Sequence, residues 1–198
     1  KKIFMKAKDV CFREQYTYKL FKDVNNVRMA PDIIFGLEPL KIQEVEDKKV
    51  IISVIDCDNK NLKHYREKYE RKIVELIKFF IRLGYKVLLM SFCKAEGDEV
   101  VINRILTYMD EKENISTYFY KDDVEESLRI LNSAKIIVGS RFHANILGLV
   151  MGKTIIPFAY SDKTINVLKD IEFKVQNKPP VKEINPFASV CSFIASKI

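Results

Sequence analysis

A buried strand is predicted to pass directly into a helix along the stretch Ile136-Ile137-Val138-Gly139-Ser140-Arg141-Phe142-His143. The residues before Gly139 are apolar and β-branched, which indicates a strand covered on both faces. Ser140 is predicted to cap the following helix, which should run to about Met151 and end at Gly152. Because open parallel sheets bind ligands at the carboxyl ends of their strands, we expect a site at this junction.

The same alternation of strand and helix continues on both sides of the junction. Short apolar runs predict strands over 50–55, 85–92, 135–139 and 154–158, and 116–120 is a further short strand candidate. Apolar residues at helical spacing predict helices over 65–83, 98–112, 122–134 and 161–171. Apolar strands that alternate with helices indicate an α/β fold with a doubly wound, mostly parallel Rossmann-like sheet.

The two ends of the chain differ from this pattern. Residues 1–45 are interpreted as a remnant of a preceding domain or a linker, and residues 46–198 as the Rossmann-like domain. Within the first segment we expect a strand over 10–12, a helix over 14–23 and an extended stretch over 27–35. Near the other end, 177–180 predicts a loop and 184–198 a final helix.

Composition limits the classes of function. The 198 residues are 47% hydrophobic, enough for one sizeable core. The net charge of +7 comes from charges of mixed sign, as in residues 63–68, which is typical of a solvated surface and not of a nucleic-acid stripe. Four scattered cysteines and no signal-peptide pattern or long apolar run place the protein in the cytoplasm. The excess positive charge could attract an anionic substrate or the inner face of the cell membrane.

Arg141 and His143 are the strongest candidates for chemistry. The first N–H groups of the predicted helix carry partial positive charge, and Arg141 can fork onto a phosphate or carboxylate. His143 can move a proton near neutral pH. An arginine at a helix start opposes the helix dipole, which favours a ligand-binding role and predicts little loss of stability on its removal. The structural alternative is an Arg141 paired with a carboxylate and a His143 packed into the core.

Further polar residues follow other predicted strands at the same expected edge. They are Arg13 after 10–12, Glu96 and Asp98 after 85–92, and Tyr160 and Lys163 after 154–158. Each has an ordinary structural explanation, such as a surface arginine or an N-cap at Asp98. The sequence has no P-loop, no GxGxxG, no GxSxG and no His/Cys metal set, so it supports no nucleotide hydrolysis, dinucleotide cofactor or metal catalysis.

Several segments together resemble one family. The stretch 137–144 is similar to the strand–Arg-x-His–Ala signature of polysaccharide pyruvyl transferases, and 146–149, 152–157, Tyr160 and Lys163 continue the match. Residues 10–17 resemble the strand–Arg-Asp/Glu–Ser/Thr segment of the family, 30–35 its Pro-Asp-x-x-Phe segment, and 91–98 its mid-domain loop. The ordered set identifies the chain with the C-terminal portion of such an enzyme.

The resemblance implies a fold and a reaction. It implies the donor-binding C-terminal domain of a GT-B-type transferase, which transfers pyruvate from phosphoenolpyruvate onto two sugar hydroxyls as a ketal. His143 would then be catalytic, and the donor or another anion would be bound by Arg13, Ser140, Arg141 and Lys163. Glu96, Asp98 and Tyr160 would lie at the ligand edge.

The implied partner is a glycan or lipid-linked sugar acceptor in exopolysaccharide biosynthesis, with phosphoenolpyruvate as the donor substrate and no further cofactor. Members of the family are usually longer, so the isolated chain is expected to be incomplete as an enzyme. Two alternatives stay open: a GT-B glycosyltransferase that uses a nucleotide sugar, and a non-enzymatic relative that binds an anion.

Overall fold

A computed structural model describes residues 1–37, 46–158 and 162–170. The loop predicted over 177–180, the helix predicted over 184–198 and the domain boundary predicted at residue 45 lie outside these ranges. In the described ranges, no helix is both long enough and apolar enough to span a membrane.

The centre of the molecule is a five-stranded parallel sheet. Its strands are β3 (Lys49–Ser53), β4 (Lys86–Ser91), β5 (Ile115–Phe119), β6 (Ile136–Gly139) and β7 (Thr154–Pro157). The strand order is β5-β4-β3-β6-β7, with every pair parallel. The chain therefore builds outward from β3 on one side and then returns to build the other side. This confirms the α/β class with a doubly wound parallel sheet, and it puts the switch point between β3 and β6.

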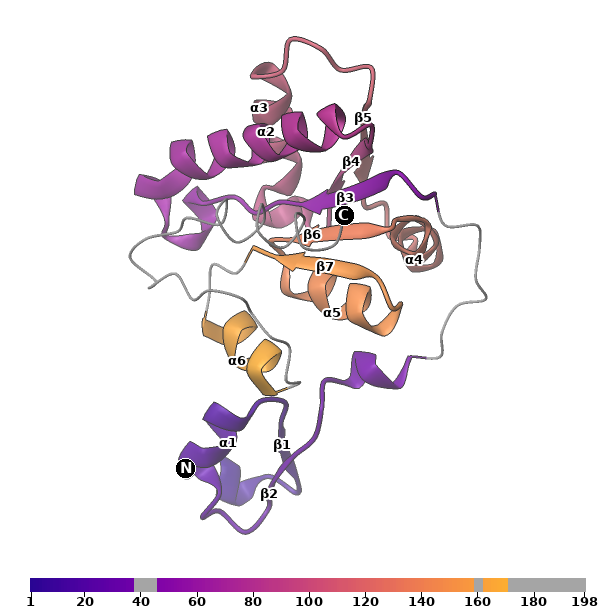
Figure 1. Cartoon of the computed structure of the whole chain (residues 1–198). Coiled ribbons are helices and arrows are strands. Elements are labelled where there is room, and N and C mark those ends of the chain that lie inside the picture. Colours follow the sequence, from indigo (N-terminus) through magenta and orange to yellow (C-terminus); the bar gives the residue numbers. More distant parts are fainter. Residues whose placement is uncertain (38–45, 159–161, 171–198) are drawn as a thin grey trace.

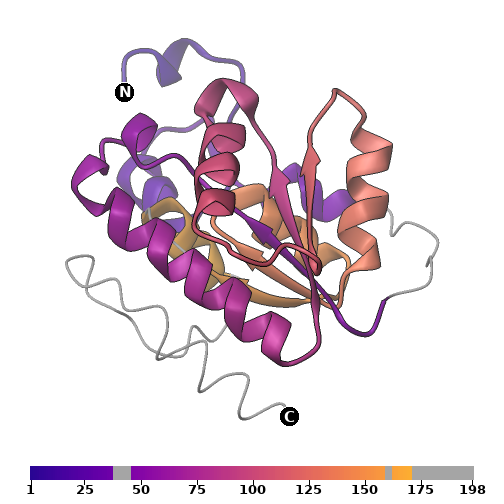
Figure 2. The same cartoon turned by 90° about the horizontal axis from the view of Figure 1, so that it is seen from above.

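Helices cover both faces of the sheet (Figures 1 and 2). Helices α2 (Arg66–Arg82) and α3 (Asp98–Thr107) lie on one face, and α4 (Val124–Ser133), α5 (Phe142–Val150) and α6 (Asp162–Asp170) lie on the other. Alternation along β3 sorts the contacts, since Ile52 belongs to the core with α2 and Ile51 to the core with α4 and α5. Both residues are fully buried, as the apolar run predicts.

Most predicted elements are present, with shifted ends. Helix α2 ends before Gly84, whose φ of +78° suits a helix stop. Helix α3 ends at Thr107, short of the predicted Lys112. Met109, just beyond its end, is buried against the first core. That packing takes the place of a further helical turn.

The N-terminal segment forms a separate small unit. Strands β1 (Val10–Phe12) and β2 (Val27–Met29) pair in parallel, with helix α1 (Gln15–Phe21) between them in sequence. The helix lies beside α6, where the N–H of Gln15 donates to Asp170 at 2.6 Å (Figure 1).

The extended stretch predicted over 27–35 is wrong in its second half. A 3-10 helix occupies Ile33–Gly36, because the Asp32 carboxylate accepts from the N–H of Ile34 and closes the first turn. Ile34 and Phe35 pack against Phe142 of α5. This packing attaches the N-terminal segment to the start of the helix that carries His143.

Candidate functional site

The carboxyl ends of β3 and β6 meet in a buried hydroxyl cluster. The hydroxyl of Ser53 accepts from the N–H of Arg141 at 3.1 Å. The hydroxyls of Ser140 and Tyr69 lie 2.9 Å apart, and Tyr69 also accepts from the N–H of Ile55. Burial raises the pKa of Tyr69, which keeps this phenol neutral. The cluster joins β3, β6 and α2 at the switch point.

The prediction that Ser140 caps α5 is therefore wrong. The helix begins at Phe142 with Arg141 in the N-cap position, and the Arg141 side chain makes no capping hydrogen bond to the helix. Ser140 is fully buried, and its hydroxyl is engaged by Tyr69. The sequence pattern located the junction correctly but placed the cap one residue too early.

Arg141 forms a buried ion-pair cluster. Its Nε donates to Asp98 at 3.1 Å, a second guanidinium nitrogen also bonds to Asp98, and the third bonds to Glu96. The side chains of Arg141 and Asp98 are only 11% and 0% exposed. Burial by itself would lower the pKa of Arg141, but the bonds to the two carboxylates outweigh it and raise that pKa. The structural alternative, a paired arginine, thus describes Arg141.

Asp98 connects two strand ends. Besides Arg141, its carboxylate accepts from the N–H groups of Phe92 and Cys93, at 2.9 and 3.0 Å. Glu96 bonds to Lys60 at 2.6 Å, and the hydrogen bonds from Lys60 and Arg141 lower the pKa of Glu96 to about 2. The loop after β4 and the junction after β6 are therefore held together by charge, at the edge where the sequence predicts a ligand.

A second charged cluster lies on the neighbouring helices and was not predicted. Arg104 of α3 bonds to Glu70 of α2 at 2.7 Å and to Asp56 at 3.2 Å. Asp56 shortly follows β3, so the rule that polar residues after strands gather at one edge could have found it. Glu70 and Arg104 lie within helices and carry no comparable signal.

Arg13, Asp32, Phe142 and His143 come together beside this edge. The guanidinium carbon of Arg13 lies 4.6 Å from the centre of the Phe142 ring, and the His143 ring lies 5.2 Å from the same ring, edge to face. Arg13 is paired with Asp32, and about a third of its side chain, 34%, stays exposed. His143 is exposed, so the alternative of a core histidine does not describe it.

Asp32 is the residue of this group that sequence reasoning did not single out. Burial opposes its ionisation, but the N–H of Ile34 and the Arg13 guanidinium outweigh that effect and lower its pKa. The charge of His143 lowers it further, so the imidazole lies near enough to act on the carboxylate. The sequence did contain a signal that could have pointed to Asp32, because this residue belongs to the Pro-Asp-x-x-Phe segment.

The structure describes some of the other predicted site residues and not others. Glu96 and Asp98 lie at the predicted edge as partners of Arg141. Lys163 belongs to the first turn of α6, and its side chain lies outside what the structure describes. Tyr160 lies outside the described residues altogether.

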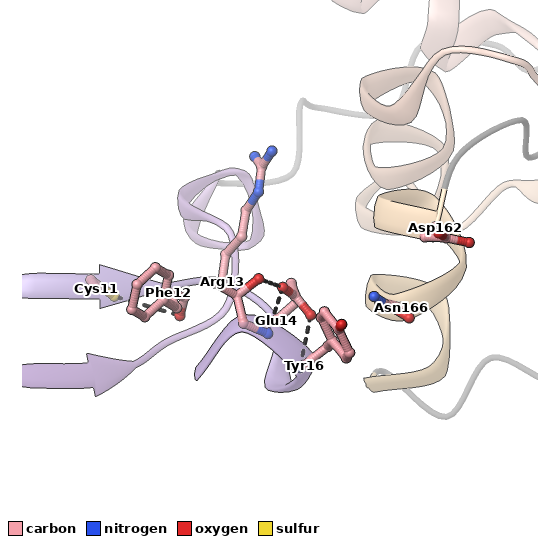
Figure 3. A pocket seen from close by; sticks show the side chains of 8 residues that line it. Cys11, Phe12, Arg13, Glu14, Tyr16, Asp162 and Asn166 are labelled. Atoms are coloured by element: carbon pink, nitrogen blue, oxygen red, sulfur yellow. Dashed lines mark hydrogen bonds between the residues drawn. The ribbon is translucent and has the colours of Figure 1, made fainter. Parts of the chain in front are cut away.

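A cavity of about 560 Å³ opens next to Arg13 (Figure 3). One wall comes from β1 and α1, and the other from α6; the lining residues are Cys11, Phe12, Arg13, Glu14, Tyr16, Thr17, Asp162 and Asn166. Glu14 serves the local structure, because its carboxylate caps α1 by accepting from the N–H groups of Tyr16 and Thr17.

A family model of polysaccharide pyruvyl transferases matches residues 1–162. The chain belongs to the polysaccharide pyruvyl transferase family. The matched range includes the two groups described above, with Arg13 and Asp32 near its start and Arg141 and His143 near its end. The residues that cluster around Phe142 therefore all lie within the part of the chain that matches the family.

Solved structures and curated proteins add little to the family assignment. The UDP-GlcNAc 2-epimerase from Methanocaldococcus jannaschii is similar at 11% sequence identity and a TM-score of 0.45, over 78% of this chain and 47% of the epimerase chain. The chain thus spans about half the length of that protein. The comparison with curated proteins found no match to this chain.

Proposed function

We propose that the chain forms the donor-binding part of an enzyme that transfers pyruvate from phosphoenolpyruvate to two hydroxyls of a sugar. The acceptor belongs to a cell-surface polysaccharide or to its lipid-linked precursor. The observation that carries the proposal is that a partly exposed Arg13 and an exposed His143 both lie against the Phe142 ring. Membership in the pyruvyl transferase family supports it.

In this proposal the Arg13 guanidinium is preorganised to bind an anion. Asp32 and the Phe142 ring fix its position, which lowers the entropy lost when it binds. Its remaining N–H donors suit the carboxylate or phosphate of phosphoenolpyruvate. Arg141 is less suited to direct contact because Asp98 and Glu96 already engage its guanidinium. We assign it the role of a positioning residue that holds the junction before His143.

The proposed reaction needs two proton movements. A proton adds to the methylene carbon of phosphoenolpyruvate, one sugar oxygen bonds to the central carbon, the phosphate leaves, and the second sugar oxygen bonds to the same carbon. The two hydroxyls lose two protons; one ends on the new methyl group and the other on the phosphate. In this proposal His143 carries one of the protons, and its exposed imidazole on the Phe142 ring supports that role.

Calorimetric titration with phosphoenolpyruvate tests the donor site. Arg13→Ala should weaken binding by about 1.5–3 kcal/mol, the range of hydrogen bonds to charged groups, which is roughly 10- to 150-fold in Kd. Arg28→Ala is the matched control, since Arg28 lies in the same segment and pairs with Asp9 on the surface. Equal binding by Arg13→Ala and the parent would refute the proposal. Tighter binding of UDP- or GDP-sugars than of phosphoenolpyruvate would favour a glycosyltransferase.

A further inference from the structure

The cavity beside Arg13 has two chemically different sides (Figure 3). Tyr16 lines one side with an aromatic side chain, and this residue is 62% exposed. Asn166 projects toward it from α6, and Asp162, one helical turn earlier, lines the same cavity. A ligand between these walls would meet a flat ring on one side and an amide and a carboxylate on the other.

This combination suits a neutral sugar better than a phosphate. The C–H face of a pyranose can pack on an aromatic ring, and its hydroxyls can bond to amide and carboxylate oxygens. A trianionic donor would be repelled by Asp162, and Glu14 adds a second negative charge to the lining. The volume of about 560 Å³ lies within the range of about 300–1,000 Å³ that is usual for small-molecule sites.

Arg13 connects the cavity to the proposed donor site. It lines the cavity, but its guanidinium extends away from Tyr16 and Glu14 (Figure 3) and reaches Asp32 and the Phe142 ring. A donor held by Arg13 and His143 would therefore adjoin the cavity without occupying its α6 side. A sugar in the cavity would have its hydroxyls next to the reacting carbon of the donor.

We infer that this cavity is the acceptor site and that it takes a pyranose, with the ring against Tyr16 and the hydroxyls bonded to Asn166 and Asp162. The inference rests on the proposed function, because only that function requires a sugar beside the anion. It assigns acceptor recognition to α1 and α6, within the described chain.

Saturation-transfer NMR with simple glycosides tests the assignment. The probes are the methyl glycosides of galactose, glucose, mannose, N-acetylglucosamine and N-acetylmannosamine, with and without phosphoenolpyruvate. At least one should receive saturation from the parent protein, and Tyr16→Ala and Asn166→Ala should each weaken its binding at least tenfold. The matched controls are Tyr108→Ala and Asn103→Ala, an exposed tyrosine and an exposed asparagine away from the cavity. Both controls should bind like the parent.

The exposed thiol of Cys11 offers a second measurement that needs no disruptive substitution. Cys11 lines the cavity. Alkylation with N-ethylmaleimide should block glycoside binding in the parent, and Cys11→Ser should keep binding after the same treatment. Bound glycoside should in turn slow the alkylation of Cys11.

The outcomes separate this inference from the proposed function. If phosphoenolpyruvate binds but no glycoside does, or if glycoside binding survives in Tyr16→Ala, Asn166→Ala and the alkylated protein, the acceptor assignment is wrong and the donor site stands. If phosphoenolpyruvate itself fails to bind the parent, the proposed function is wrong. Loss of glycoside binding with unchanged donor affinity in Tyr16→Ala and Asn166→Ala supports both.

Discussion

Arg141 and His143 are two residues apart, yet the fold gives them opposite environments. Arg141 is buried between two carboxylates, whereas His143 is exposed next to Arg13. Arg141 is the N-cap residue of α5, whereas His143 lies in the first helical turn between the buried Phe142 and Ala144. At this position one residue holds two loops together and the other is open to solvent.

The buried pair makes Arg141 costly to remove. Arg141→Ala would leave Asp98 fully buried without its cation, and losing one partner of such a pair costs about 3–5 kcal/mol. Arg28→Ala breaks an exposed pair with Asp9 and should cost about 0–1 kcal/mol. Urea unfolding of both variants measures the difference. Equal midpoints would contradict the buried pairing.

Asp32 gives the folded state a dependence on acid. Its pKa is lowered from the ordinary value of 3.8, so its contribution to stability is complete above that pH and is lost as the pH falls through the lowered value. Asp32→Asn should therefore lose less stability than the parent as the pH falls below 3.8. Urea unfolding across this range measures it. The exposed Asp23→Asn serves as the control and should follow the parent curve.

His143 is predicted to act in proton transfer. With a full-length enzyme and an acceptor in hand, His143→Ala should lower turnover by roughly 10²–10⁴-fold. His143→Gln should be nearly as slow, because glutamine keeps a hydrogen bond but moves no proton. Steady-state kinetics with each variant separates turnover from donor KM. A large rise in KM with preserved turnover, rescued by lysine, would mean that His143 only binds the phosphate.

The sequence predicted the position of these residues better than their roles. A strand that ends in Gly-Ser-Arg before a helix locates the edge, and Arg13 follows a second strand in the same way. The partners of Arg141 could not be assigned, because Asp98 reads equally well as a helix cap and a distant pairing leaves no local pattern. Burial of Arg141 depends on the loop after β4 reaching past the end of β3 to the junction after β6, an arrangement that follows from the strand order.

At the scale of elements, one tight turn sets the geometry of the site. Gly97 lies between the short 3-10 helix Lys94–Glu96 and α3, with a φ of +82°. A Cβ at this position would lie 2.6 Å from Asp56 Oδ2 and 2.7 Å from Asn59 Nδ2. The turn can therefore bring Glu96 and Asp98 to Arg141 only while this residue lacks a side chain.

Two glycines with similar backbone conformation separate strain from crowding. Gly152 has a φ of +66°, and a Cβ at this position would meet no neighbouring atom within 4 Å. Gly152→Ala should cost about 1–2 kcal/mol from the left-handed conformation alone. Gly97→Ala should cost clearly more, because the same strain is joined by a clash. Thermal unfolding of both variants tests this, and equal losses would show that the loop relaxes around the new methyl group.

Elements were predicted reliably where the apolar pattern was long. Four of the five strands of the main sheet follow apolar runs in the sequence, with β5 as the exception, and the ends of all five lie within two residues of the prediction. The Ile33–Gly36 turn was missed because Ile33, Ile34 and Phe35 read as an extended apolar run. Its conformation is set by the Asp32 cap and by packing on Phe142, and neither is visible in a local window.

At the scale of the whole molecule, burial is unevenly distributed. The residues of β3 from Val50 to Ser53 are fully buried, whereas the buried residues of the described segment 1–37 are Glu14, Val24 and Asp32. Ile3, Met5 and Ile33 in that segment are largely exposed. The N-terminal unit thus has little core of its own and depends on its contacts with α5 and α6.

Hydrogen exchange should follow this distribution. Amides of β3, β4 and β6 should exchange most slowly, and those of β1, α1 and β2 much faster, because poorly buried units open locally at low free energy. Mass spectrometry of peptides after timed exchange measures both regions in one experiment. Phosphoenolpyruvate should slow exchange around residues 10–17 if Arg13 binds it. Uniform protection over both regions would contradict a weakly stabilised N-terminal unit.

The position of β3 at the centre of the sheet also affects how the chain is made. It is the first of the five strands to leave the ribosome, and β4 can pair with one of its edges soon afterwards. The other edge must wait for β6, which follows only after β5 and α4 have been synthesised. During that interval a strand with the apolar centre Val50-Ile51-Ile52 has an open edge, the feature that promotes pairing with other chains. Slow translation between β4 and β6 would lengthen this exposure, so the nascent chain is expected to need a chaperone there.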